Sequence, residues 1–217
     1  MEEFAWEETF QAESKRRKKK APIIYKLDQA TRWRTKPFRP DTHDNYVRWF
    51  KGGRVLDIGC GGGDHIQPPL EPYGIEISTH LHSKAQHKMQ AHGGFCVHGD
   101  AVSGIDAFVD QFFDGVLLRS YLEHETVPLE VLKKLHRVLK SSGSIYVKVP
   151  NYGSLNRRLM GARWCGFRYP DHVNYFTPAS LDQMGQQAGY RMHIINRFNL
   201  HFDDNIHVLL APTASRH

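Results

Sequence analysis

The stretch "VLDIGCGGGD", from Val55 to Asp64, predicts a buried strand that runs directly into a glycine-rich turn. Four glycines stand in its last six residues. A backbone without Cβ atoms can come close to a ligand, and turns of this kind occur at the ligand end of α/β sheets. The alternative is a glycine-rich turn that binds nothing. The stretch favours an α/β fold with a ligand site at the end of this strand.

The residues around the turn limit which ligand it can take. A dinucleotide fingerprint, G-x-G-x-x-G, needs a third glycine where this chain has Asp64. Asp57, two residues before the first glycine, would repel a pyrophosphate and stabilise a cation. Pro68, Pro69 and Pro72 interrupt the following segment, so little helix dipole is left for phosphates. A nucleoside with positive charge and no phosphate fits, and S-adenosylmethionine is such a ligand.

Two further acids follow the next two predicted strands. Glu76, in "YGIEI", stands 19 residues after Asp57, where a carboxylate can accept hydrogen bonds from both ribose hydroxyls. Asp100 follows "FCVHG" and can accept a hydrogen bond from the adenine amino group, with Ala101 beside the ring. Acids after strands are also common helix caps, and amides of the glycine turn can satisfy Asp57. Three acids at successive strand ends favour the nucleoside site.

Strands and helices alternate along the rest of the chain. Further strands are predicted over "FFDGVLL", "SIYVKVP", "RMHIINRF" and "NIHVLL". Helices are predicted over "DTHDNYVRWF", from Ser78 to Met89, from Pro128 to "SSG", and over "TPASLDQMGQQAGY". This order predicts a Rossmann-like, doubly wound, mostly parallel sheet of seven strands. No helix separates the last two strands, which predicts an antiparallel pair at one edge.

Composition is that of an ordinary globular protein, with 40% hydrophobic and 24% charged residues. No apolar run approaches the roughly 20 residues that cross a bilayer, and the amino terminus lacks the order of a secretory signal. Cys60, Cys96 and Cys165 form no C-x-x-C pair, which argues against a disulfide framework and a structural zinc. A cytoplasmic location without a membrane span is therefore expected.

The formal charge of +6 has one source, the cationic run Lys15–Lys20. Without these six residues the chain holds 23 basic and 23 acidic residues. Such runs are usually solvated, and the alternative is a strip that docks on anionic surfaces. We expect a basic, partly flexible extension over residues 1–40 and contact with nucleic acid only through it.

Several stretches resemble, in order and spacing, the motifs of class I S-adenosylmethionine-dependent methyltransferases. They are "VLDIGCGGG", "YGIEIS", "HGDA", "FDGVLLRSYLEH", "LKKLHRVLKSSGSIYVKVPN" and "PDHVNYFTPASLDQMGQQAGY". The likeness is greatest to the small-molecule branch that includes the ubiquinone-biosynthesis O-methyltransferases, and it covers about Tyr46 to Leu210. It implies a transferase of enzyme class 2.1.1, a reversed last strand, a methyltransferase domain over residues 41–217, and S-adenosyl-L-homocysteine as product.

The resemblance also implies which residues contact the cofactor. They are Asp57, Gly59, Cys60, Gly61, Gly63, Glu76, Ile77, Asp100, Ala101, Leu118, Arg119 and Ser120. The proline-broken segment after Asp64 departs from relatives, which continue a long helix there. That departure leaves open how the methionine carboxylate is held, and closure by Tyr25, Arg32 and Arg34 of the extension is one answer.

Methyl transfer requires that the acceptor be positioned in line with the methyl group and, for a hydroxyl acceptor, that a base take the proton. A sulfonium already has a neutral leaving group, so we expect no metal, and in-line approach supplies most of the acceleration. His124 and His172 are the candidate bases; each can instead organise a loop by a hydrogen bond. "RSYLEH" lacks the Asn/Asp-Pro-Pro-aromatic element of relatives that act on base amino groups, which argues against methylation of DNA bases.

The substrate side is expected over residues 150–176, a long connection rich in aromatic and arginine residues. Trp164, Arg168, Asn174 and Tyr175 are the substrate candidates, which suits an aromatic or acidic acceptor. The alternative is that the aromatic rings only pack this loop onto the sheet.

The sequence thus predicts methyl transfer to a small molecule, with oxygen favoured over nitrogen or carbon. One alternative is a protein or RNA methyltransferase recruited by the basic extension. Another is a module that binds S-adenosylmethionine without catalysis.

Overall fold

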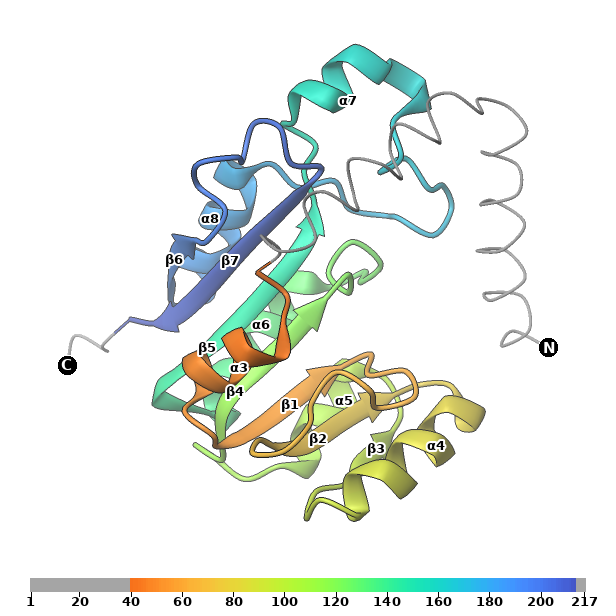
Figure 1. Ribbon diagram of the computed structural model, residues 1–217, viewed down its shortest axis with the longest axis vertical. Coiled ribbons are helices and arrows are strands. Elements are labelled where there is room, and N and C mark those ends of the chain that lie inside the picture. Colours follow the sequence, from red (N-terminus) through yellow and green to blue (C-terminus); the bar gives the residue numbers. More distant parts are fainter. Residues whose placement is uncertain (1–39, 214–217) are drawn as a thin grey trace. The chain divides into compact units, whose positions relative to one another are not determined.

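The computed structural model describes residues 40–213 (Figure 1). The cationic run Lys15–Lys20 and the proposed closing residues Tyr25, Arg32 and Arg34 lie outside these residues. The described chain forms one seven-stranded sheet in the order β3-β2-β1-β4-β5-β7-β6. The strands are β1 (Arg54–Ile58), β2 (Glu71–Glu76), β3 (Cys96–His98), β4 (Phe113–Arg119), β5 (Leu139–Pro150), β6 (Tyr190–Ile194) and β7 (Asn205–Pro212). The expected mostly parallel sheet is confirmed.

The antiparallel pair at one edge is also confirmed. β7 runs antiparallel to both of its neighbours, β5 and β6. The last strand of the chain is therefore inserted between β5 and β6, and β6 forms the edge. All other pairs in the sheet are parallel.

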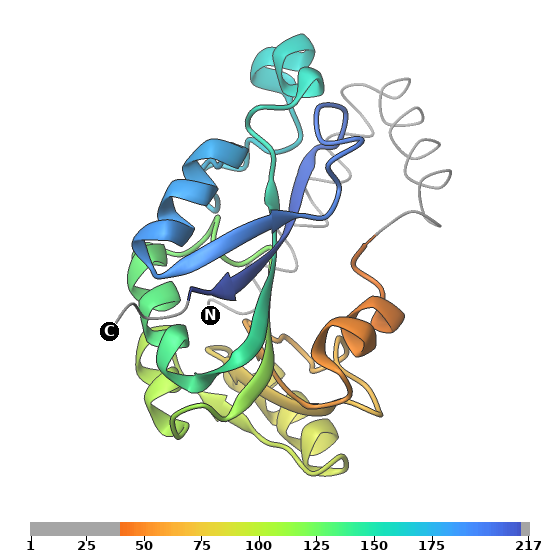
Figure 2. The same cartoon turned by 90° about the vertical axis from the view of Figure 1, so that its left-hand side faces the viewer.

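Helices cover both faces of the sheet (Figure 2). They are α3 (His43–Phe50), α4 (Thr79–Gln90), α5 (Ala101–Gly104), α6 (Pro128–Val138), α7 (Leu155–Met160) and α8 (Pro178–Gln187), with 3-10 turns η2 (Ile105–Ala107) and η3 (Gly161–Arg163). Successive strand residues point to opposite faces. Leu56, Val116 and Ile145 accordingly belong to the core under α5, α6 and α8, whereas Val55 and Tyr146 belong to the core with α3. Burial on both faces explains the continuous apolar runs.

The local helix signals act as expected. The Ser78 side chain accepts a hydrogen bond from the Leu81 backbone at the start of α4, and Pro128 occupies the first turn of α6. Thr177 and Ser180 form a reciprocal capping box at the start of α8. No helix separates β1 from β2 among the described residues, in agreement with the prolines there.

Two predicted boundaries were wrong. "SSG" was expected to end the helix before the fifth strand, but α6 ends at Val138 and "SSG" lies inside β5. Leu139 already has extended backbone and pairs with Phe113 of β4, and an irregularity in the pairing lets the strand continue past Gly143. β6 ends at Ile194, four residues earlier than expected, because turns occupy the chain from there to β7.

Within residues 40–213, none of the helices has the length and apolar character needed to cross a membrane.

The packing of α3 on β4 can be tested at Gly115. A Cβ added there would lie 2.2 Å from Cδ1 of Phe50. Gly115→Ala should therefore lower the free energy of unfolding by about 1–3 kcal/mol, as overpacked cores do, measured by urea denaturation. In α8, a Cβ on Gly185 would make only an ordinary contact, 3.4 Å from Leu210. Gly185→Ala should be neutral or stabilising, and equal losses in both variants would contradict this packing.

Candidate functional site

The glycine turn is anchored on β2 and open on its other side. The backbone amides of Gly59 and Cys60 donate to the Ile75 carbonyl oxygen at 2.9 and 3.2 Å. Gly59, Gly61 and Gly63 have φ angles of 66°, 55° and 77°, which residues other than glycine rarely adopt. The Tyr121 ring, in the turn after β4, comes within 3.0 Å of where a Gly59 Cβ would be. The turn thus keeps a bare backbone between β1 and Tyr121.

Glu76 ties this turn to the end of β2. Its side chain is buried, with 7% of the residue exposed. One carboxylate oxygen accepts from the Gly61 amide at 2.8 Å and the other from the Ser78 amide at 2.9 Å. A carboxylate offers about four lone-pair sites, so both oxygens can accept further bonds. Ile77 follows with 71% of its surface exposed, which provides an apolar contact beside the carboxylate.

Asp57 has a partner that sequence reasoning missed. The buried Asp57 carboxylate lies 2.9 Å from Nδ1 of half-buried His65. This contact replaces the glycine-turn amides that had been considered as its partners. His65 opens the proline-broken segment, and a histidine eight residues after a buried acid was the available signal. The structure therefore keeps the negative charge of Asp57 close to the glycine turn.

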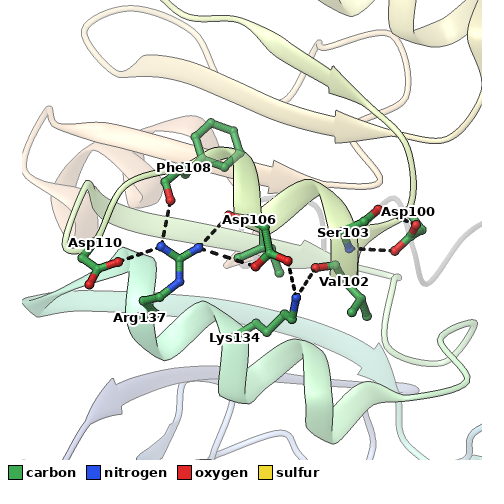
Figure 3. A network of polar contacts seen from close by, with 9 residues as sticks. Asp100, Val102, Ser103, Asp106, Phe108, Asp110, Lys134 and Arg137 are labelled. Carbon is green, nitrogen blue, oxygen red and sulfur yellow. Dashed lines mark hydrogen bonds and ion pairs between the residues drawn. The ribbon is translucent and has the colours of Figure 1, made fainter.

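Asp100 is a helix cap in this structure (Figure 3). Its carboxylate accepts hydrogen bonds from the backbone amide and the hydroxyl of Ser103, at 2.9 and 2.5 Å. These bonds lower the pKa of Asp100. The side chain is exposed, so it can accept another bond, whereas Ala101 is buried in the core.

Two of the other expected cofactor residues, Cys60 and Leu118, can offer only backbone to the site because their side chains are buried. Cys60 points inward, with its Sγ 3.6 Å from the Sγ of buried Cys96. Leu118 is fully buried in the core at the end of β4. Arg119 is half-buried, and Ser120 is exposed with φ at 52°. The Ser120 amide donates to the Lys148 carbonyl oxygen at 2.8 Å, which fixes the backbone where β4 ends.

The two candidate bases, His124 and His172, come together from distant parts of the sequence. Their rings lie 4.7 Å apart at 85°. Nδ1 of His124 lies 2.8 Å from the Asp171 carbonyl oxygen, and Nδ1 of His172 lies 2.9 Å from that of Gly166. A carbonyl can only accept, so both Nδ1 atoms carry the proton. Each Nε2 is therefore left with a lone pair.

Burial keeps both imidazoles neutral. It is the main cause that lowers the pKa of His124, and it lowers the pKa of His172 to about 4, with repulsion from His124 and Arg168 added. Both rings can therefore accept at Nε2 at pH 7.

Glu123 is the third member of this cluster and was missed by sequence reasoning. Only 1% of the residue is exposed, and its Oε2 has no hydrogen-bond partner. Desolvation raises the pKa of Glu123 to about 7, against the opposing effects of Lys148 and Arg168. One ligand atom from each of Glu123, His124 and His172 lies within 4.8 Å of the others. An acid directly beside His124 was the signal in the sequence.

The loop over residues 150–176 is fastened to the turn after β4. The Val173 and Asn174 amides donate to the Glu123 carbonyl oxygen at 2.9 and 3.1 Å. The Asn174 side chain donates to the carbonyl oxygens of Leu122 and Glu125 at 3.0 and 2.5 Å. Both side-chain donors of Asn174 are thus used within the protein, which places Asn174 as a brace between two loops.

Asp204, next to β7, fastens the other end of this loop. Its carboxylate accepts hydrogen bonds from the Ser154 hydroxyl, the Asn156 side-chain amide and Trp164 Nε1, at 3.2, 2.6 and 2.8 Å. Trp164 is buried. Of the expected substrate residues, Trp164 therefore fits the packing alternative.

Tyr175 and Arg168 stay nearer the surface. Half-buried Tyr175 packs on the rings of Tyr152 and Phe167, at 5.8 and 5.4 Å between centroids. Arg168 is half-buried and forms an ion pair with Asp171 at 3.6 Å. Both side chains lie on the loop that carries His172.

The pairing of Asp57 with His65 can be tested without any ligand. His65→Ala leaves a buried carboxylate short of a partner, which typically costs about 1–3 kcal/mol. The free energy of unfolding, measured by urea denaturation of the cofactor-free protein, should fall by that amount. His193→Ala is the control, because His193 is exposed on β6. A loss no larger than that of the control would show that Asp57 does not depend on His65.

Comparisons with known proteins identify the family and the fold. The model of the methyltransferase domain family matches residues 31–194. A ubiquinone biosynthesis O-methyltransferase from Aeromonas salmonicida is 27% identical over 157 residues, which cover 64% of this chain and 63% of that protein. Another, from Chromobacterium violaceum, is 24% identical over 194 residues, covering 82% of this chain and 81% of that protein. The chain thus spans less than two thirds of the first relative and about four fifths of the second.

A solved structure supports the fold. The crystal structure of an S-adenosylmethionine-dependent methyltransferase from Archaeoglobus fulgidus matches with a TM-score of 0.57 at 19% identity, over 84% of this chain and 93% of that chain. The family model covers more than half of the residues, so the chain belongs to the methyltransferase domain family, and it shares the fold of that S-adenosylmethionine-dependent methyltransferase.

Proposed function

We propose that this protein transfers a methyl group from S-adenosylmethionine to a hydroxyl oxygen of a small molecule. The observation that carries the proposal is the pair of neutral imidazoles, His124 and His172, which lie beside Glu123 and whose Nδ1 protons are donated to backbone carbonyls, so that each Nε2 keeps its lone pair. Such groups can take the proton that a hydroxyl acceptor must lose. Relatives named ubiquinone biosynthesis O-methyltransferase support oxygen as the acceptor atom.

The cofactor lies along the ends of the first strands in this proposal. The glycine turn lets the backbone approach the nucleoside, and Glu76 accepts from the ribose hydroxyls while its orientation is fixed by Gly61 and Ser78. Exposed Ile77 packs on the adenine, and Asp100 accepts from the adenine amino group beside its helix-capping bonds. The buried charge of Asp57 favours the cationic methionine end.

The turn after β4 connects this cofactor site to the histidine pair. The Tyr121 ring lies beside Gly59, and the Tyr121 carbonyl oxygen accepts from the His124 amide at 2.9 Å. The acceptor would thus lie between the sulfonium and residues 150–176, with Tyr175 and Arg168 suited to a ring and an acidic group. Positioning there supplies most of the acceleration, since the sulfonium has a neutral leaving group.

The ribose contact is tested by Glu76→Gln. The amide keeps the shape of the side chain but removes the charge from hydrogen bonds worth about 1.5–3 kcal/mol each. The dissociation constant for S-adenosyl-L-homocysteine, measured by isothermal titration calorimetry, should rise at least about tenfold. Glu130→Gln is the control, since Glu130 is exposed at the start of α6. Unchanged affinity of Glu76→Gln, in a variant that folds normally, would rule out Glu76 as the ribose ligand.

The acceptor side is tested by methylation of a panel of small hydroxylated aromatic acids and matched aromatic amines, followed by mass spectrometry. On the best acceptor, His124→Ala and His172→Ala should each slow methyl transfer by roughly 10²–10⁴, the usual contribution of a proton acceptor. Affinity for S-adenosyl-L-homocysteine should stay unchanged, and His193→Ala should turn over like the parent. If both variants kept the parent rate, or only amines were methylated, the hydroxyl proposal would be wrong.

A further inference from the structure

We propose that Glu123, His124 and His172 form a binding site for a divalent transition-metal ion such as Zn²⁺. A carboxylate oxygen and two imidazole nitrogens, one from each residue, lie within 4.8 Å of one another. Two of these residues follow β4, and the third comes from the loop over residues 150–176. The fold therefore brings three metal-ligand atoms to one buried point from segments 48 residues apart in sequence.

The imidazoles are oriented as metal ligands usually are. Each donates its Nδ1 proton to a backbone carbonyl, that of Asp171 for His124 and that of Gly166 for His172. Metal-bound histidines almost always donate their other ring N–H in this way, because the bond fixes the tautomer and the direction of the ligating lone pair. In each ring, Nε2 is thus the nitrogen that can ligate an ion.

Glu123 supplies an independent reason for a cation at this point. Its Oε2 is buried and has no hydrogen-bond partner. Buried carboxylate oxygens without a partner are costly, and the unprotonated Nε2 atoms of the two histidines can donate no hydrogen bond to this oxygen. A metal ion satisfies all three lone pairs at once. The alternative is that Glu123 is protonated and no metal ion is bound, and the experiment must distinguish these two cases.

The ligand set and the nearby charges indicate the kind of ion. Two imidazoles and one carboxylate favour Zn²⁺, Co²⁺ or Mn²⁺ over Mg²⁺ and Ca²⁺, which prefer oxygen ligands. Three protein ligands leave a coordination position open. Lys148 and Arg168 add positive charge near Glu123, although Arg168 is paired with Asp171. An anionic oxygen from the acceptor would offset this charge, so the ion and the acceptor should strengthen each other's binding.

What the ion does rests on the proposed function. A hydroxyl bound to the open position would lose its proton to water more readily, as water does on zinc. The resulting oxygen attacks the methyl carbon, the O–C bond forms as the C–S bond breaks, and sulfur keeps the electron pair. His124 and His172 then act as ligands, and the ion replaces them in activating the hydroxyl.

The first experiment measures binding alone. The untagged, full-length chain is treated with chelator and titrated with Co²⁺, whose visible absorption reports tetrahedral or five-coordinate ligation, and with Zn²⁺ by calorimetry. We expect one ion per chain. His172→Ala, His124→Ala and Glu123→Gln should each weaken binding by at least about 100-fold, the upper end of what loss of even an indirect partner costs. His193→Ala should bind like the parent.

The outcomes distinguish metal binding from protonation of Glu123. They also distinguish the metal site from the proposed methyl transfer. Glu123→Gln keeps the side-chain volume, and its amide can donate to an imidazole as a protonated Glu123 would. If Glu123 is protonated and no ion binds, this variant should therefore be stable, and the parent should show no Co²⁺ absorption. That result, or equal binding by all variants, would overturn the inference. Chelator-resistant methyl transfer to a hydroxyl, without Co²⁺ absorption, would leave the proposed function standing alone. One bound ion without methylation of any hydroxyl would leave only the metal site.

Discussion

The ends of β1 and β2, where we propose that the cofactor binds, are held together by the carboxylate of Glu76. It accepts one hydrogen bond from the glycine turn after β1 and one from the backbone that leads into α4. Because both bonds are to backbone amides, they hold the ends of two parallel strands in one arrangement whatever the neighbouring side chains do. Burial makes these charge-assisted bonds stronger than they would be in water. The open face of the glycine turn and the exposed Ile77 are placed by this one group.

The acceptor side is built differently, because its parts come from loops. Asn174 and the Glu123 carbonyl oxygen join the turn after β4 to the loop that carries His172. Sites on loops need such braces, since loops lack the hydrogen-bond ladder of a sheet. The brace explains how a histidine from residues 150–176 meets one from the end of β4. It also leaves Glu123 buried, with the charge balance of the cluster set by Lys148 and Arg168.

Much of the fold, including the position of the glycine turn and of the acids at the strand ends, could be predicted from the sequence, because strand period, helix caps and glycine spacing are local signals; the cofactor contacts of these residues stay predictions. The same signals failed at "SSG", where pairing of Leu139 with β4 outweighed the turn preference of serine and glycine. The contacts of Asp57 with His65 and of Glu123 with His172 could not be predicted, because each depends on a loop folding back. Trp164 and Asn174 were expected to face a substrate, but their side-chain N–H groups donate to Asp204 and to backbone carbonyls.

The position of Asp204 late in the sequence determines when the loop over residues 150–176 can be fastened during synthesis. This residue, which fastens Ser154, Asn156 and Trp164, emerges from the ribosome 40 residues after Trp164. During synthesis the first four strands, with the glycine turn and Glu76, are complete well before that point, and domains assemble as their residues become available. The residues of the glycine turn and Glu76 are therefore available for folding first. The bonds that fasten the loop over residues 150–176 to Asp204 can form only after the chain has been made up to the start of β7.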